Sequence, residues 1–345
     1  MINLSLHYDF RAPEFGPDPS AIYSTALEQC AWGDALGFTR VTLSSHHGSD
    51  DNYGPSPLIA GAAIAGVTKA MRIIPVVPLP LYHPLHVAED VAVLDQLSGG
   101  RIDLMVVAGY VAAEYAMFGR SMNRRGALME EGIRALRQAW TGEQFQFRGE
   151  TVRVRPRPMQ RPGPAIVIGG DSRGAARRAA RLGDGYAAMA GGDSWNDYVE
   201  ACIELGRAVP QRSRRQTAMF VYVSEDPEAA WPKLAPHLMH VNNSYARWMT
   251  ADARSQSYTW ADTLDDLKSG PACLVLTPDE CVRRAREWGG VMFDPLCGGI
   301  PPDLSWASLD LVQRTVMPLL NQTVPGVPAD AGHDRPQNDH ERTAP

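Results

Sequence analysis

Three segments of the chain share one pattern of apolar and polar positions. In each, apolar residues recur at helical spacing up to a glycine, and a short continuous apolar run follows within a few residues. The segments are "CAWGDALGFTRVTL" (30–43), "AARRAARLGDGYAAMA" (175–190) and "CVRRAREWGGVMFDPL" (281–296). Glycine at such a position is typical of the left-handed residue that ends a helix, and the apolar run indicates a strand buried on both faces. The repeat therefore predicts parallel βαβ units.

The rest of the chain supplies more elements of the same kind. Strands are predicted at residues 2–8, 71–79, 101–109, 165–170 and 217–223, and helices at 21–36, 86–100 and 125–142. With the strands of the repeated segments the count is about eight, each followed by a helix. This favours a single (β/α)8 TIM barrel, an α/β fold, over a doubly wound sheet. Pro75 and Pro78 lie inside one predicted strand and lack an N–H donor, so we expect that strand to be short or bulged.

Two segments fall outside the repeat. Residues 143–162 alternate in polarity, which predicts a small hairpin at the rim of the barrel. Residues 225–271 form a long insertion between strands 7 and 8, and a connection of this length is typical of a lid or a binding insertion. Its aromatic residues, Tyr245 and Trp248 among them, either line a substrate pocket or fasten the insertion to the barrel.

The end of the chain differs in composition from the rest. From about Thr323 it is rich in Pro, Asp and His and has almost no aliphatic residues. Such a segment cannot bury enough apolar surface to fold. We therefore predict a barrel domain over residues 1–322 and a disordered tail over residues 323–345.

Composition and charge narrow the class of protein. The 345 residues are 44% hydrophobic and 21% charged, as in a folded soluble protein, and the net charge of −6 argues against a nucleic-acid partner. Five scattered cysteines without a C-x-x-C pair predict neither a disulfide framework nor a zinc site, which favours a reducing cytoplasm. We expect no signal peptide and no membrane segment, because the first residues lack a basic leader and no uncharged stretch is long enough to cross a bilayer.

Two adjacent histidines follow the second predicted strand, in "SSHHGSDDNYGPSP" (44–57). The loop after each strand of a parallel barrel lies at the catalytic end, so at least one of His46 and His47 should point into the mouth. An imidazole titrates near neutrality and suits a catalytic base, but a loop histidine equally serves as a helix cap or a surface residue. A metal site with Asp50 or Asp51 is disfavoured, because adjacent side chains diverge in an extended segment and no other cluster completes a ligand shell. We therefore predict no metal site.

A second candidate site lies where a predicted strand leads through two glycines into a helix. The stretch contains Gly169, Gly170, Asp171, Ser172 and Arg173. The glycines allow a ligand to approach the backbone, and the free N–H groups and dipole of a helix N-terminus attract a phosphate. Asp171 would contribute only its backbone, because its carboxylate repels phosphate. The same residue types also occur at ordinary helix N-caps.

Several stretches, taken in order and with their spacing, resemble one known family. They are "HHGSDDNYGPSPL" (46–58), "LPLYHPLHVAEDVAVLDQLSGGRIDLMVVAGY" (79–110), "EYAMFG" (114–119), "RGALMEEGIRALRQAW" (125–140), "GGDSRGAARRAARLGDG" (169–185), "LTPDECVRRAREW" (276–288) and "VMPLL" (316–320). From residue 2 to about residue 320 the chain resembles the bacterial luciferase-like flavin-dependent oxidoreductases. The resemblance implies a single (β/α)8 barrel that binds reduced FMN, or in some branches a deazaflavin coenzyme, at the carboxyl ends of the strands.

The resemblance also implies roles for the two histidines. His46 matches a histidine at the reactive edge of the flavin, which acts as a general base or stabilises the peroxyflavin in luciferases and helps proton transfer in deazaflavin enzymes. His47 matches a second, less exposed histidine at the pocket, with a structural role. Many relatives have glutamate before this pair, whereas this chain has Ser45. The change removes a carboxylate that would orient the imidazole.

Other matches concern the flavin ring. The segment "LPLYHP" matches the place where the family often has a non-prolyl cis peptide under the ring, here Leu81–Tyr82, although its prolines by themselves also predict a turn. Gly109 and Tyr110 are expected to flank the ring system. Glu114 is expected to reach the rim of the substrate pocket.

One position departs from the family pattern. Luciferases carry an arginine after the fourth strand that neutralises the cofactor phosphate, and the matching residue here is Ala108. Either Arg173 or Arg177 supplies the charge instead, or the cofactor differs from FMN.

On this resemblance we predict a flavin-dependent monooxygenase. It would use dioxygen and reduced FMN, supplied by a separate reductase, to oxidise a small organic substrate, since no dinucleotide fingerprint indicates an NAD(P)H site in this chain. The alternatives are a deazaflavin-dependent hydride-transfer enzyme, a flavin-binding barrel without turnover, and a metal-dependent hydrolase on the same fold. Relatives commonly pair through helices near the start of the barrel, so we expect a homodimer. The fold does not identify the substrate.

Overall fold

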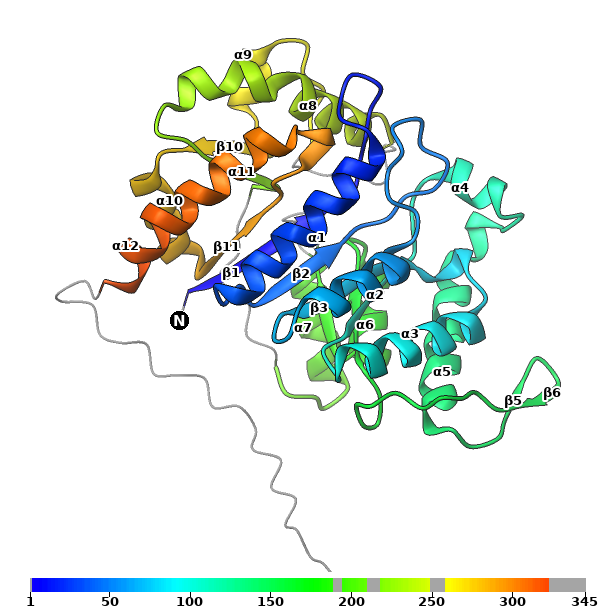
Figure 1. The fold of residues 1–345 in the computed structure, drawn as a ribbon. Coiled ribbons are helices and arrows are strands. Elements are labelled where there is room, and N and C mark those ends of the chain that lie inside the picture. Colours follow the sequence, from blue (N-terminus) through cyan, green and yellow to red (C-terminus); the bar gives the residue numbers. More distant parts are fainter. Residues whose placement is uncertain (1, 189–193, 210–217, 249–257, 323–345) are drawn as a thin grey trace, which may run out of the picture.

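A curled sheet of seven parallel strands forms the frame of the structure. The structure, a computed structural model, describes residues 2–188, 194–209, 218–248 and 258–322 (Figure 1). In the order of the sheet, the strands are β11 (Gly290–Phe293), β1 (Asn3–Tyr8), β2 (Arg40–Leu43), β3 (Arg72–Pro78), β4 (Asp103–Val107), β7 (Ala165–Gly169) and β8 (Gly185–Ala187). All pairings in this sheet are parallel, so the carboxyl ends of its strands share one edge.

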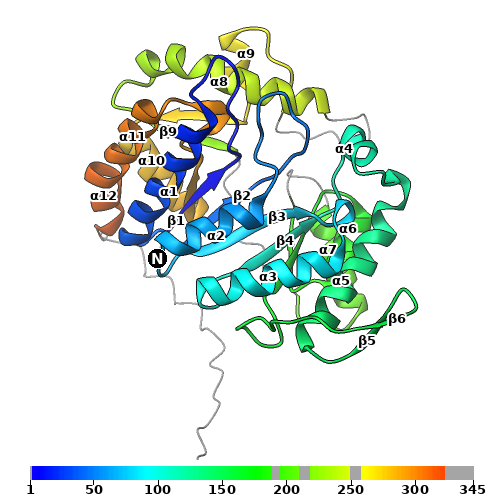
Figure 2. The same cartoon turned by 45° about the vertical axis from the view of Figure 1, so that its right-hand side comes forward.

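Helices connect the strands and cover the outer face of the sheet (Figure 2). The main ones are α1 (Pro19–Ala35), α2 (Pro57–Val67), α3 (Pro84–Ser98), α5 (Arg125–Thr141), α6 (Arg173–Leu182) and α10 (Pro278–Trp288). The predicted left-handed glycines are present at Gly37 and Gly289 of the repeated segments and at Gly99 and Gly142 after α3 and α5. The prediction is wrong for Gly183, which ends α6 in an extended conformation with φ −91°. Apolar residues of the helices and strands, such as Leu6, Val41 and Ile73, pack in one large core. The repeated pattern of the sequence thus predicted these units correctly.

Shorter elements complete the chain. They are α4 (Ala112–Met117), α7 (Ser194–Glu204), α11 (Pro302–Leu311), a π-helical turn (Val312–Val316), α12 (Met317–Asn321) and the 3-10 turns Leu79–Leu81, Met122–Arg124 and Cys297–Gly299.

Two further parallel strands pair with each other outside the seven-stranded sheet. They are β9 (Phe220–Val223) and β10 (Cys273–Leu276), and β9 also contacts β11. The described part of the chain therefore contains nine parallel strands, where the sequence predicted about eight. β10 was missed because it is only four residues long and directly follows the insertion.

β3 runs for seven residues, contains Pro75 and ends at Pro78, so the expectation of a short or bulged strand is wrong. Leu43 of β2 faces Pro75 at the last position of their ladder, and Val107 of β4 faces Pro78 at the last position of theirs. Each proline therefore lies where a ladder ends, and a missing N–H donor is tolerated there.

The insertion after β9 folds mainly as one long helix, α8 (Pro227–Trp248), followed by α9 (Leu264–Ser269). A second apolar cluster, which includes the buried Phe220, Trp231 and Leu238, fastens α8 to β9 and β10. Both views place α8 near the loop that follows β1 (Figures 1 and 2). The insertion thus lies over the carboxyl edge of the strands.

The predicted hairpin is present as β5 (Phe145–Phe147) and β6 (Glu150–Val152), and it lies at the end of the molecule away from α8 (Figure 1). None of the helices within the described ranges is long and apolar enough to cross a membrane. The tail predicted over residues 323–345 lies outside the described residues.

Candidate active site at the carboxyl edge of the sheet

Both ring nitrogens of His46 have a hydrogen-bonding partner. The residue follows β2 and is buried, with 9% of its surface exposed. Its Nδ1 lies 2.8 Å from Oε1 of Glu114, and its Nε2 lies 3.3 Å from the hydroxyl of Tyr110. A carboxylate accepts only, so Nδ1 carries the proton of the neutral ring and Nε2 is left as its basic nitrogen. The arrangement fixes both the tautomer and the direction of the ring.

Glu114 supplies the carboxylate that many relatives have at the position of Ser45. It lies on α4, is buried, and accepts from the backbone N–H of His47 at 2.8 Å as well as from His46. The Ser45 hydroxyl instead donates to the carbonyl of Val76. Glu114 is therefore beside the histidine itself, deeper than the pocket rim that the sequence suggested.

Four aromatic rings surround His46, and Tyr110, with its ring centroid 5.5 Å away, is one of them. The ring centroids of Trp248, Tyr53 and Tyr245 lie 4.5, 4.8 and 6.2 Å from that of His46. The hydroxyls of Tyr53 and Tyr245 are 2.9 Å apart, which joins the loop after β2 to the last turns of α8. We call Tyr53, Tyr245 and Trp248 the aromatic enclosure. Tyr245 and Trp248 were singled out from the sequence, whereas Tyr53 was not, although it lies in the same quoted loop.

His47 is more exposed than His46, contrary to the expectation that it would be the less exposed of the pair. Its Nε2 lies 3.3 Å from the hydroxyl of Tyr82, and its ring packs edge-on against Phe118 at 4.8 Å. Partial burial and the neighbouring His46 lower the pKa of His47, while Glu114 opposes the shift. His47 therefore favours the neutral form. It lies at the border of the site and not at its centre.

The peptide bond between Leu81 and Tyr82 is not cis, so that prediction is wrong; the cis bonds of the described chain precede Pro156 and Pro162. Leu81 ends the 3-10 turn that follows β3, as the prolines of the segment allow. The Tyr82 hydroxyl donates to the carbonyl of Pro55 at 3.2 Å, which ties this turn to the histidine loop.

The glycine-rich candidate site lies on the same edge of the sheet. Val107, at the end of β4, is paired with Gly169 at the end of β7. Gly170 follows with φ 141°, and Ser172 caps α6 by accepting from the N–H of Ala175 at 3.1 Å. The histidine loop after β2 and this helix N-terminus after β7 thus lie on the same carboxyl edge of the sheet, with β3 and β4 between their strands.

The arginines proposed to neutralise a phosphate have other partners. Arg173 lies 3.4 Å from Asp197, and Arg177 lies 2.5 Å from Glu204, both on α7. At the end of β4 the carbonyl of Ala108 accepts from the hydroxyl of Tyr115, and Gly109 has a positive φ of 75°. Both arginines are therefore paired with carboxylates of α7, and the supply of the missing charge by Arg173 or Arg177 stays a prediction.

A buried cluster of charged residues lies beside the aromatic enclosure, and no local pattern in the sequence predicts it. Arg11 is fully buried and pairs with Asp9 and Asp51. His240 of α8 also reaches Asp51 at 2.7 Å, and His7 of β1 lies 2.9 Å from Asp294. These residues come from loops and strand ends far apart in the chain, and only the fold brings them together.

Burial and mutual charge shift the pKa values of this cluster. Burial and the charge of Asp294 raise the pKa of Asp9 to about 6, against the opposing effect of Arg11. Burial would raise the pKa of Asp51, but hydrogen bonds from His240 and Arg11 hold it well below its usual range. Burial also opposes protonation of His7, yet Asp294 raises its pKa.

The residues suggested for a metal do not form a common ligand set. Asp51 is bound by Arg11 and His240, and Asp50 is exposed. Within the described ranges, Asp9, Asp294 and Cys297 have ligand atoms within 4.8 Å of one another. The guanidinium of Arg11 lies 3.2 Å from Asp9, and this positive charge disfavours a cation there.

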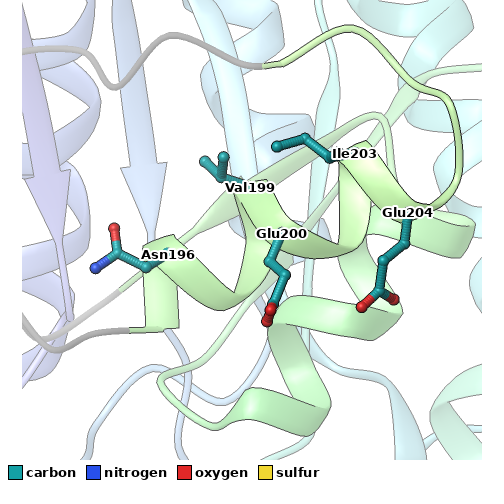
Figure 3. A pocket seen from close by; sticks show the side chains of 5 residues that line it. All are labelled: Asn196, Val199, Glu200, Ile203 and Glu204. Atoms are coloured by element: carbon teal, nitrogen blue, oxygen red, sulfur yellow. The ribbon is translucent and has the colours of Figure 1, made fainter.

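A surface depression elsewhere has no catalytic character. It lies along α7 and is lined by Asn196, Val199, Glu200, Ile203 and Glu204 (Figure 3). Of the residues discussed above, only Glu204, the partner of Arg177, lines it, and its groups come from one helix face.

Residues 10–294 match the luciferase-like monooxygenase family, and the chain belongs to this family. It is 33% identical over 174 residues to an FMNH(2)-dependent dimethylsulfone monooxygenase of Pseudomonas putida, which covers 48% of this chain and 47% of that one. The chain thus spans about half the length of this relative. It is 25% identical over 347 residues to the 4-hydroxyprotoasukamycin monooxygenase of Streptomyces nodosus subsp. asukaensis, and this match covers 92% of each chain.

Two solved structures have the same fold. The monooxygenase RslO1 from Streptomyces bottropensis matches with a TM-score of 0.75 and 24% identity, over 92% of this chain and 99% of that one. An F420-dependent secondary alcohol dehydrogenase matches with a TM-score of 0.67 and 17% identity, over 93% and 99%. The curled parallel sheet is therefore that of the family.

Proposed function

We propose that the protein is the oxygenase of a two-component flavin-dependent monooxygenase. It would take reduced FMN from a separate reductase and use dioxygen to oxidise a small organic substrate. The observation that carries the proposal is His46, which is held at both ring nitrogens inside an aromatic enclosure at the carboxyl edge of the sheet. The FMNH(2)-dependent relative supports the choice of cofactor.

The backbone around the second candidate site fits a phosphate-bearing flavin. A Cβ at Gly170 would approach Ala175 to 3.1 Å, and one at Gly169 would approach Val107 to 2.8 Å, so the chain keeps this strand end free of side chains. The first N–H groups of α6 have no intrahelical acceptor and favour an anion. Gly169, Gly170 and Ser172 would hold the phosphate, and Gly109 and Tyr110 would lie along the ring system.

Each residue of the first site then has a distinct task. Reduced FMN supplies, when bound, the electrons that activate dioxygen. His46 accepts or returns a proton at Nε2, and Glu114 stabilises the protonated ring through Nδ1. The aromatic enclosure excludes water from the reacting atoms. Tyr245 and Trp248 belong to the insertion, so α8 would complete the substrate pocket.

Anaerobic titration with reduced FMN, followed by mixing with aerated buffer, tests the proposal. We expect saturable binding and reoxidation of bound FMN that is slower than that of free FMN. His46→Ala should keep the flavin affinity within about threefold and change the reoxidation rate by about a hundredfold, the usual contribution of a general base. His47→Ala is the matched control and should change that rate far less. Equal behaviour of the two variants would support a flavin-binding barrel without turnover.

The alternative is a deazaflavin coenzyme and hydride transfer. Ala108 leaves no arginine at the end of β4, and an F420-dependent dehydrogenase has the same fold. Titrating the protein with reduced FMN and with F420 in parallel decides between them. Tighter binding of F420 would replace the first proposal by the second.

The proposal extends to the assembly of the chain. The strands would close into the barrel of the family, with residues 225–271 as the insertion between β9 and β10. Ile59, Val67, Val93 and Leu97 are exposed apolar residues on the adjacent helices α2 and α3, and they would form a homodimer interface. Light scattering of wild type and Ile59→Asp would test the dimer. The five free, buried cysteines suit a cytoplasmic location.

A further inference from the structure

Arg11 is a fully buried arginine whose bonding is incomplete. It follows β1 and has no exposed surface. Its Nη1 donates to Asp51, and its Nε lies 3.2 Å from Asp9. Among the described residues, neither Nη2 nor Nε has an acceptor in good hydrogen-bonding geometry, and the Tyr245 hydroxyl is the polar group close to the guanidinium. A buried donor without an acceptor is costly, and it recurs where a ligand supplies the missing acceptor.

The aromatic enclosure contacts Arg11 as well as His46. The guanidinium carbon lies 4.5 Å from the ring centroid of Tyr53 and 5.1 Å from those of Tyr245 and Trp248. The same three rings contact the His46 imidazole. A cationic donor and a candidate proton-transfer group thus face one apolar enclosure from two sides.

The charges around Arg11 indicate which acceptor it would bind. Asp51 is ionised because its pKa is held low, and it already balances the guanidinium charge. Asp9 adds a further acidic group beside the arginine, and Asp294, next to Asp9, is paired with His7. A carboxylate ligand would meet this excess of negative charge, whereas a neutral oxygen would not. The rings favour a flat apolar body next to that oxygen.

We propose that Arg11 is a substrate-binding residue whose Nη2 donates to a neutral carbonyl oxygen of an apolar, ring-bearing substrate in the aromatic enclosure. The inference rests on the proposed function, because it names the substrate class of that same site. Tyr245 and Trp248 belong to the last turns of α8, so this end of the helix would shift to admit the substrate.

Binding of matched pairs to the flavin-free protein tests the inference. Each pair differs only at the carbonyl: acetophenone against ethylbenzene, and benzophenone against diphenylmethane. We expect at least one ketone to bind about tenfold or more tightly than its hydrocarbon, as a hydrogen bond from a charged donor provides. The infrared carbonyl stretch of that bound ketone should move to lower frequency. If neither ketone is preferred, or if the stretch does not move, the inference is wrong.

Arg11→Lys keeps the positive charge but removes the Nη2 donor. It should abolish the preference for the ketone and leave hydrocarbon binding within about threefold. The matched control is Arg247→Lys, because Arg247 also lies over an aromatic ring of the insertion, at 5.8 Å from Trp260, but is exposed. Equal weakening of both ligands would assign Arg11 a purely structural role. If Arg11→Lys does not fold, the infrared measurement on wild type decides alone.

These measurements separate this inference from the proposed function, because they need no flavin. A ketone preference without binding of reduced FMN would retain the Arg11 site and reject the monooxygenase. Binding of reduced FMN without any ketone preference would reject the Arg11 site and retain the monooxygenase.

Discussion

His46 and Glu114 are 68 residues apart in the chain, yet Nδ1 of the imidazole lies 2.8 Å from Oε1 of the carboxylate. The same oxygen also accepts from the backbone N–H of His47. One buried carboxylate oxygen therefore orients the ring of one histidine and the backbone of the next. We place Glu114 as a positioning residue that acts through His46.

Replacing Glu114 by glutamine separates its charge from its geometry. The amide oxygen of Glu114→Gln can accept from both donors, but it no longer stabilises a protonated imidazole. We expect the reaction of bound reduced FMN with oxygen to slow by about tenfold to a hundredfold. This is less than the full rate contribution of a general acid or base, because His46 itself is retained. The lower pKa of its pH–rate profile should also fall, because the protonated ring is less favoured.

Glu114→Ala should lower the free energy of unfolding more than Glu114→Gln does. It leaves two donors unpaired, and each unpaired donor costs about 1–3 kcal/mol of stability. Flavin affinity should change less than threefold in both variants, as measured by anaerobic titration. An unchanged pH–rate profile in Glu114→Gln would refute the positioning role.

Gly170→Ala tests the phosphate site. Gly170 has φ 141°, which an L side chain rarely adopts, and the new Cβ would lie 3.1 Å from Ala175. Such strain costs about 1–3 kcal/mol, so we expect FMN to bind about tenfold more weakly. Riboflavin, which lacks the phosphate, should lose less affinity. Gly206→Ala is the control, since Gly206 also has a positive φ but has open space around it. Equal losses for FMN and riboflavin would place the phosphate elsewhere.

The sequence predicted the frame of the fold because its signals are local. Helix periodicity, glycine stops and apolar runs located eight of the strands and the helices α1, α3, α5, α6 and α10. It missed α8 as a helix, because Pro232 and Pro236 lie inside it and polar residues interrupt its apolar face. Tertiary contacts of Trp231 and Leu238 with the second core cluster stabilise it despite these prolines.

The candidate site could be predicted only in part for the same physical reason. His46 follows a strand, so its place at the carboxyl edge could be inferred from topology. The pairing of Glu114 with His46 depends on how α4 packs, and the burial of Arg11 depends on loops from three strands. Neither has a signal in local spacing. The cis peptide at Leu81 was carried over from relatives, and this chain forms a turn there instead.

The raised pKa of Asp9, about 6 against a usual value of 3.8, predicts a pH dependence of stability. A folded-state pKa above the unfolded one gives a stabilising contribution that is complete below about pH 3.8 and is lost as the pH rises through 6. Asparagine does not titrate. The free energy of unfolding of Asp9→Asn, relative to wild type, should therefore rise between pH 4 and pH 7, by on the order of 2–3 kcal/mol for a shift of about two pKa units.

Urea denaturation at the two pH values measures this difference. Comparison across pH removes the pH-independent change in packing and hydrogen bonding that the substitution itself causes. Asp50→Asn, at an exposed aspartate, reports the effect of removing one surface charge. A difference between Asp9→Asn and wild type that falls with rising pH would show that Asp9 is stabilised as the anion.

Trp248→Ala tests whether the aromatic enclosure protects the reaction from water. The Trp248 ring lies 4.5 Å from that of His46 and 5.1 Å from the guanidinium carbon of Arg11, so its removal opens both sides of the enclosure. We expect bound reduced FMN to reoxidise roughly tenfold faster and to release more hydrogen peroxide, because water and protons then reach the reacting atoms. Stopped-flow absorbance and a peroxide assay measure the two effects. Trp260→Ala is the matched control, since Trp260 belongs to the same insertion but is 52% exposed. If both tryptophan variants release as much peroxide as wild type, the enclosure does not shield the flavin. The role of α8 would then be limited to its packing against β9 and β10.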